Sequence, residues 1–262
     1  MTTPALLLIL AAGLGLGLAP HSHPFSWKAR TAADTFTVNG VKIRYVIEGQ
    51  GESVVLIHGL HASAELNWKV PGILGILAKD HRVIAIDLPG HGGSDKPETE
   101  EAYGAQMAED VLALLDHLKI KKAHIVGYSL GGMVALKFIA LHADRVQSGV
   151  LGGMGWLKDG GALQQVWERM AARDGGRTPA ACIRSIGKLA ITDAELKAIQ
   201  TPMTIIVGDR DPVKQLYVTP LQSVRKDWPV IEIEDAGHVN CIFKKAFADA
   251  LTKARTKPNV KP

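Results

Sequence analysis

The amino-acid sequence predicts an α/β fold in which a mostly parallel sheet of about eight strands is covered by helices on both faces. Short apolar runs, several of them rich in valine and isoleucine, alternate along the chain with longer helical patterns. The 262 residues can bury one large core, and a content of 47% hydrophobic and 21% charged residues is typical of globular proteins. One apolar run also meets a helical pattern at a serine framed by glycines, with room only for a sharp turn.

The expected strands are short apolar runs bounded by turn residues. The first two alternate apolar and polar residues around Asn39-Gly40, a strong hairpin signal, so we expect an antiparallel pair at an edge of the sheet. The later runs are largely continuous in apolar residues, as parallel strands buried on both faces require. The expected strands cover residues 36–38, 41–47, 53–57, 82–87, 123–126, 146–151, 203–207 and 230–233.

Helical patterns fill the intervals between these runs. Residues 65–79 predict a helix that breaks at Pro71-Gly72, and an amphipathic helix is expected over residues 103–118. A further helix is expected directly after Ser129, and the last one from Val239 onward. Strands and helices in this succession favour right-handed crossovers.

The stretch at about 152–200 differs from the rest, because glycine-rich and charged segments interrupt its short apolar ones. We expect two to four short helices here, inserted as a lid after the sixth strand. Thr192 and Glu195 fit a capping box at the start of the last of these helices.

Gly127-Tyr128-Ser129-Leu130-Gly131 matches the G-x-S-x-G nucleophile elbow, in which a serine sits on a strained strand-to-helix turn with its hydroxyl exposed. A Cβ at Gly127 or Gly131 would crowd the neighbouring strand or helix, and glycine tolerates unusual backbone angles. The start of the following helix carries positive partial charge, which stabilises an oxyanion. The pattern favours a nucleophilic serine over one that only shapes the turn.

A serine hydroxyl is a weak nucleophile unless a base takes its proton and a third group orients that base. After Ser129 the chain offers an acidic loop with Asp209 and Asp211, and then His238, each just past an expected strand. In an open α/β sheet such strand ends converge on one crevice. These residues can therefore meet in one site, with either aspartate as the third member.

With these residues the chain resembles the α/β-hydrolase superfamily, in its serine-nucleophile, esterase- and lipase-like branch, from about residue 36 to the closing helix. The resemblance rests on His58-Gly59-Leu60, Asp87-Leu88-Pro89-Gly90-His91-Gly92-Gly93-Ser94, GYSLGG at 127–132, GDRDPV at 208–213 and GHVN at 237–240. It implies Ser129 as nucleophile, His238 as general base and acid, and Asp211 as orienting carboxylate. The acid of the family usually falls three residues after a glycine, which favours Asp211 over Asp209.

The resemblance also implies where the reaction's negative charge is stabilised. The oxyanion hole is expected at the backbone N–H groups of Leu60 and Leu130. His58 precedes the oxyanion glycine and is expected to support that loop through hydrogen bonds, and His91 is expected to have a structural role in its own loop.

Two further residues near these motifs can contact a substrate. His61 and Tyr128 are candidates for lining the substrate site. The pair His21-x-His23 has metal-ligand spacing, but no carboxylate or cysteine completes it, so no metal is expected. No nucleotide-binding motif is present, and no cofactor is expected.

Cys182 and Cys241 are compatible with one disulfide or with two separate buried thiols.

The net charge and the N-terminal residues give expectations about the protein's partners and its cellular location. The formal net charge of +4 comes without a concentrated basic patch, so nucleic-acid binding is not expected. Residues 1–19 resemble a signal peptide, residues 20–33 a linker, and residues 34–262 a single domain. We expect a protein exported to the periplasm or medium. Because Met1–Pro4 lacks lysine and arginine, an uncleaved N-terminal anchor is the alternative, and it would be the chain's only membrane contact.

The residues together predict a cofactor-free serine hydrolase that cleaves a small or medium carboxylic ester through an acyl-enzyme on Ser129. The same triad can instead serve hydrolysis of C–C bonds, thioesters or lactones, or perhydrolase- and haloperoxidase-like chemistry. A non-catalytic binding protein on the same fold is the second alternative.

Overall fold

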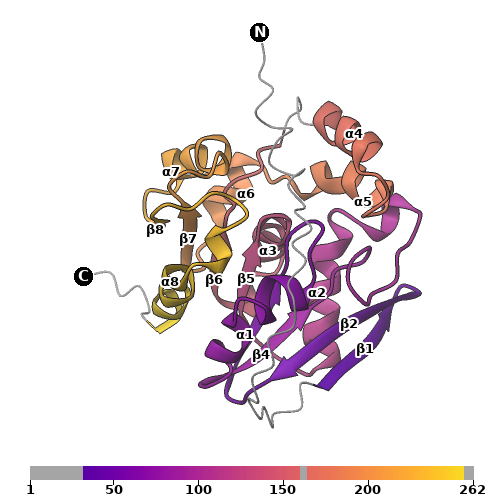
Figure 1. Ribbon diagram of the computed structural model, residues 1–262, viewed down its shortest axis with the longest axis horizontal. Coiled ribbons are helices and arrows are strands. Elements are labelled where there is room, and N and C mark those ends of the chain that lie inside the picture. Colours follow the sequence, from indigo (N-terminus) through magenta and orange to yellow (C-terminus); the bar gives the residue numbers. More distant parts are fainter. Residues whose placement is uncertain (1–31, 160–163, 257–262) are drawn as a thin grey trace, which may run out of the picture.

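The computed structural model describes residues 32–159 and 164–256 (Figure 1). The expected export segment at 1–19 and all but the end of the linker at 20–33 lie outside the described residues. Eight strands form one sheet in the order β1-β2-β4-β3-β5-β6-β7-β8. They are β1 (Ala32–Val38), β2 (Val41–Glu48), β3 (Glu52–Ile57), β4 (His81–Ile86), β5 (Ala123–Tyr128), β6 (Val146–Gly152), β7 (Met203–Gly208) and β8 (Val230–Ile233). All neighbours from β4 to β8 pair in parallel, which confirms the predicted class.

β1 and β2 form the predicted hairpin at the edge of the sheet. Asn39 and Gly40 have φ values of 49° and 77°, the left-handed conformation that a tight two-residue hairpin turn requires. Val38 and Val41 pair across the turn, and β2 continues the sheet by pairing antiparallel with β4.

Neighbouring residues of the buried strands face opposite sides of the sheet and enter two apolar clusters. Val55 and Ile57 of β3 join the cluster of α2 and α3, whereas Val54 and Leu56 join that of α1 and α8. Helices therefore cover both faces, as predicted (Figure 1). The helices outside the lid are η2 (Glu65–Lys69), α1 (Ile73–Leu77), η3 (Glu100–Ala102), α2 (Gln106–His117), α3 (Leu130–Leu141), η4 (Ala143–Arg145), η6 (Lys214–Val218), α7 (Thr219–Val224), η7 (Cys241–Phe243) and α8 (Lys245–Thr256).

Left-handed glycines set two helix boundaries, since such a residue cannot continue a right-handed helix. Gly72, with φ 79°, separates η2 from α1 and confirms the predicted break within residues 65–79. Gly104, with φ 63°, makes α2 start later than predicted. The closing helix is also shorter than predicted. It begins at Lys245 rather than Val239, because the turn η7 first places two apolar side chains in the core.

The lid, residues 153–202, connects β6 to β7. Its helices are α4 (Gln164–Arg173), α5 (Ala180–Arg184), η5 (Ser185–Leu189) and α6 (Asp193–Ala198), in agreement with the predicted short helices. The capping box is confirmed: the Glu195 N–H donates to Thr192 Oγ1 (3.1 Å), and the Glu195 carboxylate accepts from the Thr192 N–H (2.7 Å). Ile183 and Ile186 belong to the same apolar cluster as α2 and α3, so the lid shares the main core.

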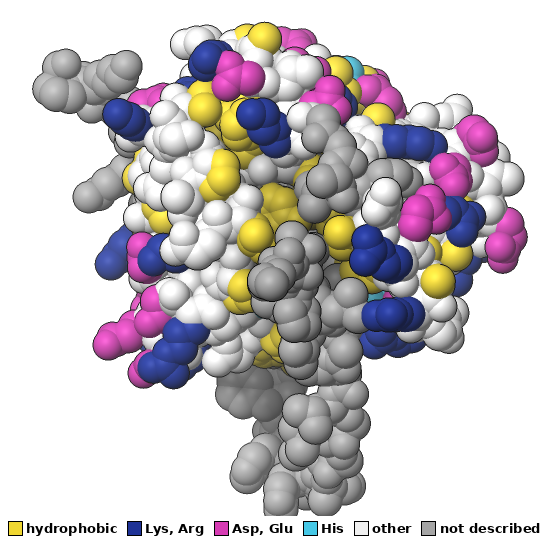
Figure 2. Space-filling model, turned by 90° about the horizontal axis from the view of Figure 1, so that it is seen from above, with side chains coloured by type: hydrophobic (Ala, Val, Ile, Leu, Met, Phe, Trp, Pro, Cys, Tyr) yellow, Lys and Arg dark blue, Asp and Glu magenta, His cyan; other side chains and the backbone are white. Residues whose placement is uncertain are grey.

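The surface on the side of the lid helices mixes apolar and charged groups. Hydrophobic side chains lie in the middle of the visible face, and charged side chains of both signs are interspersed around its edge (Figure 2). Among residues 32–159 and 164–256, no helix combines the length and apolarity needed to cross a bilayer.

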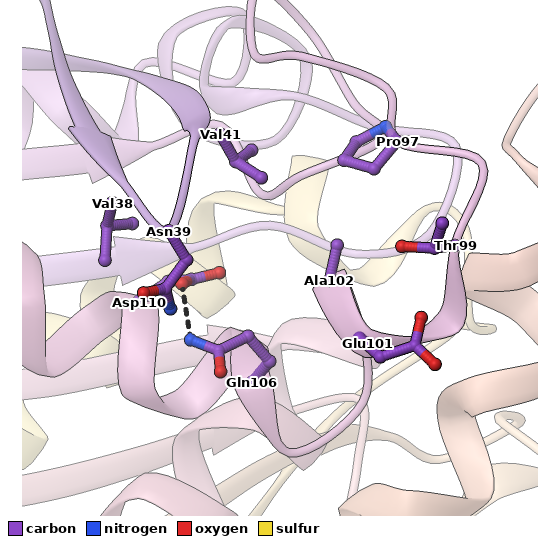
Figure 3. Close-up of a pocket in the computed structure, with 9 residues that line it drawn as sticks. All are labelled: Val38, Asn39, Val41, Pro97, Thr99, Glu101, Ala102, Gln106 and Asp110. Atoms are coloured by element: carbon purple, nitrogen blue, oxygen red, sulfur yellow. Dashed lines mark hydrogen bonds between the residues drawn. The ribbon is translucent and has the colours of Figure 1, made fainter.

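A cavity of about 320 Å³ lies between the hairpin turn, η3 and α2 (Figure 3). The buried side chain of Asp110 contributes to its lining, and Gln106 Nε2 donates to Asp110 Oδ1 (3.1 Å). Burial raises the pKa of Asp110 to about 7. In the folded protein this carboxyl group therefore acquires its charge only near neutral pH.

We expect the free energy of unfolding to depend on pH through Asp110. An aspartate in the unfolded chain loses its proton near pH 4, whereas the folded protein keeps it until about pH 7. Stability is therefore lost as the pH rises between these values. Asp110→Asn removes this titration, so the variant should gain on the order of 2 to 4 kcal/mol over the wild type between about pH 4.5 and pH 8.

Urea unfolding at both pH values measures this gain. Asp144→Asn, at an exposed position, serves as the control and should leave the pH dependence unchanged. An equal difference between Asp110→Asn and the wild type at both pH values would show that Asp110 is already ionised in the folded protein at the lower pH.

Candidate active site

Ser129 occupies the turn between β5 and α3 in a strained backbone conformation, with φ 53° and ψ −117°. A Cβ on Gly127 would lie 2.0 Å from the carbonyl oxygen of Gly131, and one on Gly131 would lie 2.1 Å from that of Ile57. Both distances are far below van der Waals contact, which confirms the steric role expected of these glycines. The Ser129 N–H donates to the carbonyl of Gly152 (2.8 Å), so the elbow is also fixed to the end of β6.

A chain of hydrogen bonds connects Ser129 with His238 and Asp211. Ser129 Oγ is 2.9 Å from His238 Nε2, and His238 Nδ1 is 2.9 Å from Asp211 Oδ2. The side chain of Asp211 is fully buried, and its other oxygen accepts the Val213 N–H (2.9 Å). Because a carboxylate only accepts, Nδ1 carries the ring proton and Nε2 is left to accept the serine hydroxyl proton.

Asp209, the rival third member, forms hydrogen bonds with the loop that precedes His238, and among the described residues no hydrogen bond joins it to the His238 ring. Its exposed carboxylate accepts the N–H groups of Asp235 (3.1 Å) and Ala236 (3.0 Å). These bonds, that to Ala236 foremost, lower the pKa of Asp209 below its usual value. The structure thus brings Asp211 to His238 and gives Asp209 a part in shaping the loop from β8 to His238.

The His58-Gly59-Leu60 loop lies directly beside the serine, since a Cβ on Gly59 would be 3.2 Å from the Cβ of Ser129. Leu130 is the first residue of α3, where the helix offers its N–H no acceptor. Among the hydrogen bonds of the described residues, neither the Leu60 N–H nor the Leu130 N–H has a protein acceptor. One donor without a protein acceptor in the described part of the chain therefore follows Ser129 directly in sequence, and the other belongs to the loop beside the serine.

Two histidines support the surrounding loops, as expected. His58 Nδ1 is 2.7 Å from the carbonyl of Gly59, and His58 Nε2 accepts the N–H of Leu88 (3.0 Å). His91 Nδ1 is 3.0 Å from the carbonyl of Pro89. Burial lowers the pKa of His58 and lowers that of His91 to about 3, so both rings are neutral.

His61 and Tyr128, the candidates for lining the substrate site, direct their polar atoms to protein partners. Tyr128 is buried, and its hydroxyl donates to the carbonyl of His238 (2.6 Å). Both ring nitrogens of His61 contact the lid, at Asp174 and Thr178. His61 also has φ 60°, a conformation that costs a residue with a Cβ about 1 kcal/mol.

No role was assigned from the sequence to two supporting side chains, Asn67 and Asp87. Asn67 Oδ1 accepts the Gly59 N–H (2.7 Å) and so holds the oxyanion loop. The buried carboxylate of Asp87 accepts the N–H groups of Ala64 (2.7 Å) and Gly93 (2.9 Å). Burial alone would raise the pKa of Asp87, but these hydrogen bonds, together with His58 and the Arg44 guanidinium, lower it below its usual value. Asp87 stands in a recognised motif, whereas nothing local in the sequence marks Asn67.

The cysteines are free and buried, Cys182 in α5 and Cys241 in η7. Of the two alternatives left by the sequence, one disulfide or two separate buried thiols, the structure shows the separate thiols. Burial raises the pKa of each thiol to about 12, which keeps both protonated and unreactive at neutral pH. Within the described part of the chain, no three His, Cys, Asp or Glu side chains are grouped so as to hold a metal ion.

Known proteins share both sequence and fold with this chain. Residues 52–184, about half of the chain, match the family model described as alpha/beta hydrolase fold. A 98-residue stretch is 45% identical to the dihydrolipoyllysine-residue acetyltransferase component of the acetoin cleaving system from Pseudomonas putida, covering 37% of this chain and 25% of that protein. A 120-residue stretch is 38% identical to the 2-hydroxy-6-oxo-6-(2'-aminophenyl)hexa-2,4-dienoic acid hydrolase from Metapseudomonas resinovorans, covering 44% of this chain and 39% of the relative. The matches thus span less than two fifths of the length of these relatives.

The similarity of fold extends over most of the chain. The crystal structure of the enol-lactonase from Burkholderia xenovorans LB400 matches with a TM-score of 0.72 and 24% identity, covering 86% of this chain and 100% of that one. At this identity the likeness concerns the fold alone. With the strand order, the elbow at Ser129 and the family match taken together, the chain belongs to the α/β-hydrolase fold family.

Proposed function

We propose that this protein is a cofactor-free serine hydrolase that cleaves a small or medium carboxylic ester through an acyl-enzyme on Ser129. The observation that carries the proposal is the continuous hydrogen-bond chain from Ser129 Oγ through His238 to Asp211. Two backbone N–H groups have no protein acceptor among the described residues: that of Leu130, which follows this serine, and that of Leu60, in the loop beside it. Together these groups meet the needs of acyl transfer.

Each group has a defined task in this mechanism. Ser129 Oγ attacks the ester carbonyl while His238 Nε2 takes its proton, and Asp211 stabilises the resulting imidazolium. The N–H groups of Leu60 and Leu130 donate to the oxyanion of the tetrahedral intermediate. His238 then returns the proton to the departing alcohol. Water, activated by His238 in the same way, hydrolyses the acyl-enzyme and restores Ser129.

Other substrates can use the same triad. Hydrolysis of a C–C bond has a specific observation in its favour, the 38% identity to a hydrolase of a 2-hydroxy-6-oxo-dienoic acid. Thioester or lactone cleavage and perhydrolase- or haloperoxidase-like chemistry are further alternatives. A binding protein without turnover would keep the fold but would not react at Ser129.

Ser129→Ala should abolish turnover of p-nitrophenyl esters of two to twelve carbons, with a loss of kcat of roughly three to six orders of magnitude. The melting temperature should barely change, because alanine keeps the Cβ and only the hydroxyl is removed. Steady-state hydrolysis measures the loss of kcat. The dependence of the wild-type rate on the length of the acyl chain indicates the size of the acyl-binding site. Ser223→Ala, at an exposed position outside the triad, is the control.

A fluorophosphonate probe separates the alternatives. Labelling of Ser129 without ester turnover would support the triad but contradict the ester substrate. C–C bonds or thioesters would then be the substrates to test. A folded wild type that is not labelled would favour the binding protein, and activity retained in Ser129→Ala would exclude this nucleophile.

Asp211→Asn should lower kcat/KM by about two to four orders of magnitude, because an amide favours the wrong tautomer of His238. Asp209→Asn is the matched variant in the same loop and should cost less than about tenfold, since an amide oxygen still accepts one of the two backbone N–H groups. Both are measured with the best ester of the panel. The reverse ranking would make Asp209 the orienting acid.

We also propose that residues 1–19 direct export and that residues 34–262 form the single domain. Expression of the full chain in a bacterial host should place the protein in the periplasm or medium, or on the membrane if the segment is retained. Cell fractionation and N-terminal sequencing test this. Recovery of the intact chain from the cytosol alone would contradict it.

A further inference from the structure

His61 forms hydrogen bonds between the oxyanion loop and the lid. His61 follows Leu60 directly, and its Nε2 is 2.9 Å from Asp174 Oδ1 while its Nδ1 is 3.0 Å from Thr178 Oγ1. Asp174 and Thr178 belong to the lid segment between α4 and α5 and are buried, with exposed fractions of 6% and 1%. These contacts join residues more than a hundred positions apart.

Both ring nitrogens of His61 and both carboxylate oxygens of Asp174 have hydrogen-bond partners within this contact. Asp174 accepts from the ring at Oδ1 and from the Thr178 N–H at Oδ2 (2.9 Å), so both of its oxygens are engaged. His61 Nε2 therefore carries the proton, and Nδ1 accepts from the Thr178 hydroxyl. A neutral ring satisfies every partner. Burial lowers the pKa of His61 and favours that state, and Arg177 Nη2, 3.8 Å away, supplies the carboxylate with a countercharge.

The same residue belongs to the turn that carries the oxyanion donor. The Ala62 N–H donates to the Gly59 carbonyl (3.2 Å), which makes Leu60 and His61 the two central residues of one turn. His61 adopts φ 60° there, a conformation that glycine would adopt without strain. A strained histidine persists at such a position when its surroundings hold it, and the surroundings here are Asp174 and Thr178.

We propose that His61 is a positioning residue that fastens the lid to the oxyanion turn, so that this lid segment and the Leu60 N–H are set in place together. The inference rests on the proposed hydrolase function for its effect on rate. The contact itself, which we call the His61 latch (His61, Asp174 and Thr178), stands on the geometry alone. Loss of the latch frees the turn, and the Leu60 N–H then spends less time where the oxyanion forms.

Three variants test the latch. His61→Gly removes the ring and relieves the strained φ, so the protein folds without a penalty from the backbone. Thr178→Val removes the hydroxyl while keeping the shape, and Thr178→Ser keeps the hydroxyl as the matched control. We expect His61→Gly to remain folded and to lower kcat for p-nitrophenyl butyrate about 5- to 20-fold, with KM changed less than about twofold. Thr178→Val should lower kcat in the same direction, and Thr178→Ser should stay within about twofold of the wild type.

The double variant shows whether His61 and Thr178 affect kcat through one shared contact or independently of each other. In the double variant His61→Gly/Thr178→Val, kcat should fall no further than in the worse single variant, because both changes break the same contact. Amide hydrogen exchange gives a second measurement that needs no substrate. The Thr178 amide should exchange at least about tenfold faster in His61→Gly than in the wild type, because the lid segment opens more often.

These measurements separate failure of the latch from failure of the hydrolase proposal. Unchanged kcat and unchanged exchange at Thr178 in His61→Gly would overturn the latch, as would equal losses in Thr178→Val and Thr178→Ser. Additive losses in the double variant would also overturn it. A wild type that fluorophosphonate does not label would refute the hydrolase, and the exchange rate would still show whether His61 fastens the lid.

Discussion

The close approach of the elbow to its neighbouring strand is the constraint on which the site depends. The backbones at Gly127, Gly131 and Ile57 lie so near one another that a methyl group has no room between them. This contact drives the chain through a strained turn at Ser129 and starts α3 immediately afterwards. It also brings the His58-Gly59-Leu60 loop, which continues β3, against the serine. One steric contact thus places the nucleophile, the helix N-terminus and the opposite donor.

Around that contact, hydrogen bonds from polar side chains hold the loops in addition to apolar packing. Asn67 holds the Gly59 N–H, Asp87 binds two backbone N–H groups of different loops, and Asp209 binds two more in the loop that leads to His238. Asp87 and Asp209 each accept two backbone N–H groups, so removal of either carboxylate takes the acceptor from two donors at once. His61 extends the same principle to the lid.

The sequence predicted the sheet well because buried parallel strands are continuous apolar runs and because Asn39-Gly40 permits few alternatives to a hairpin. The preference for Asp211 over Asp209 came from the family's spacing, and the structure brings Asp211 to His238. The late starts of α2 and α8 were missed, because Gly104 and the turn η7 override the helical pattern through tertiary contacts. The role of Asn67 and the partners of His61 were also missed. A side chain that bonds backbone or lid across the fold leaves no periodic signal in the sequence.

The lid is continuous with the main core, since Ile183, Ile186 and Leu189 share one apolar cluster with α2 and α3. It is therefore a part of the folding unit and not a detachable cover. A lid transplanted from another member of the family would have to refill that shared interior before it could confer a new preference. In this chain, exchange of the lid as a module would therefore disturb the main core, whereas single substitutions at its exposed positions would leave that core intact.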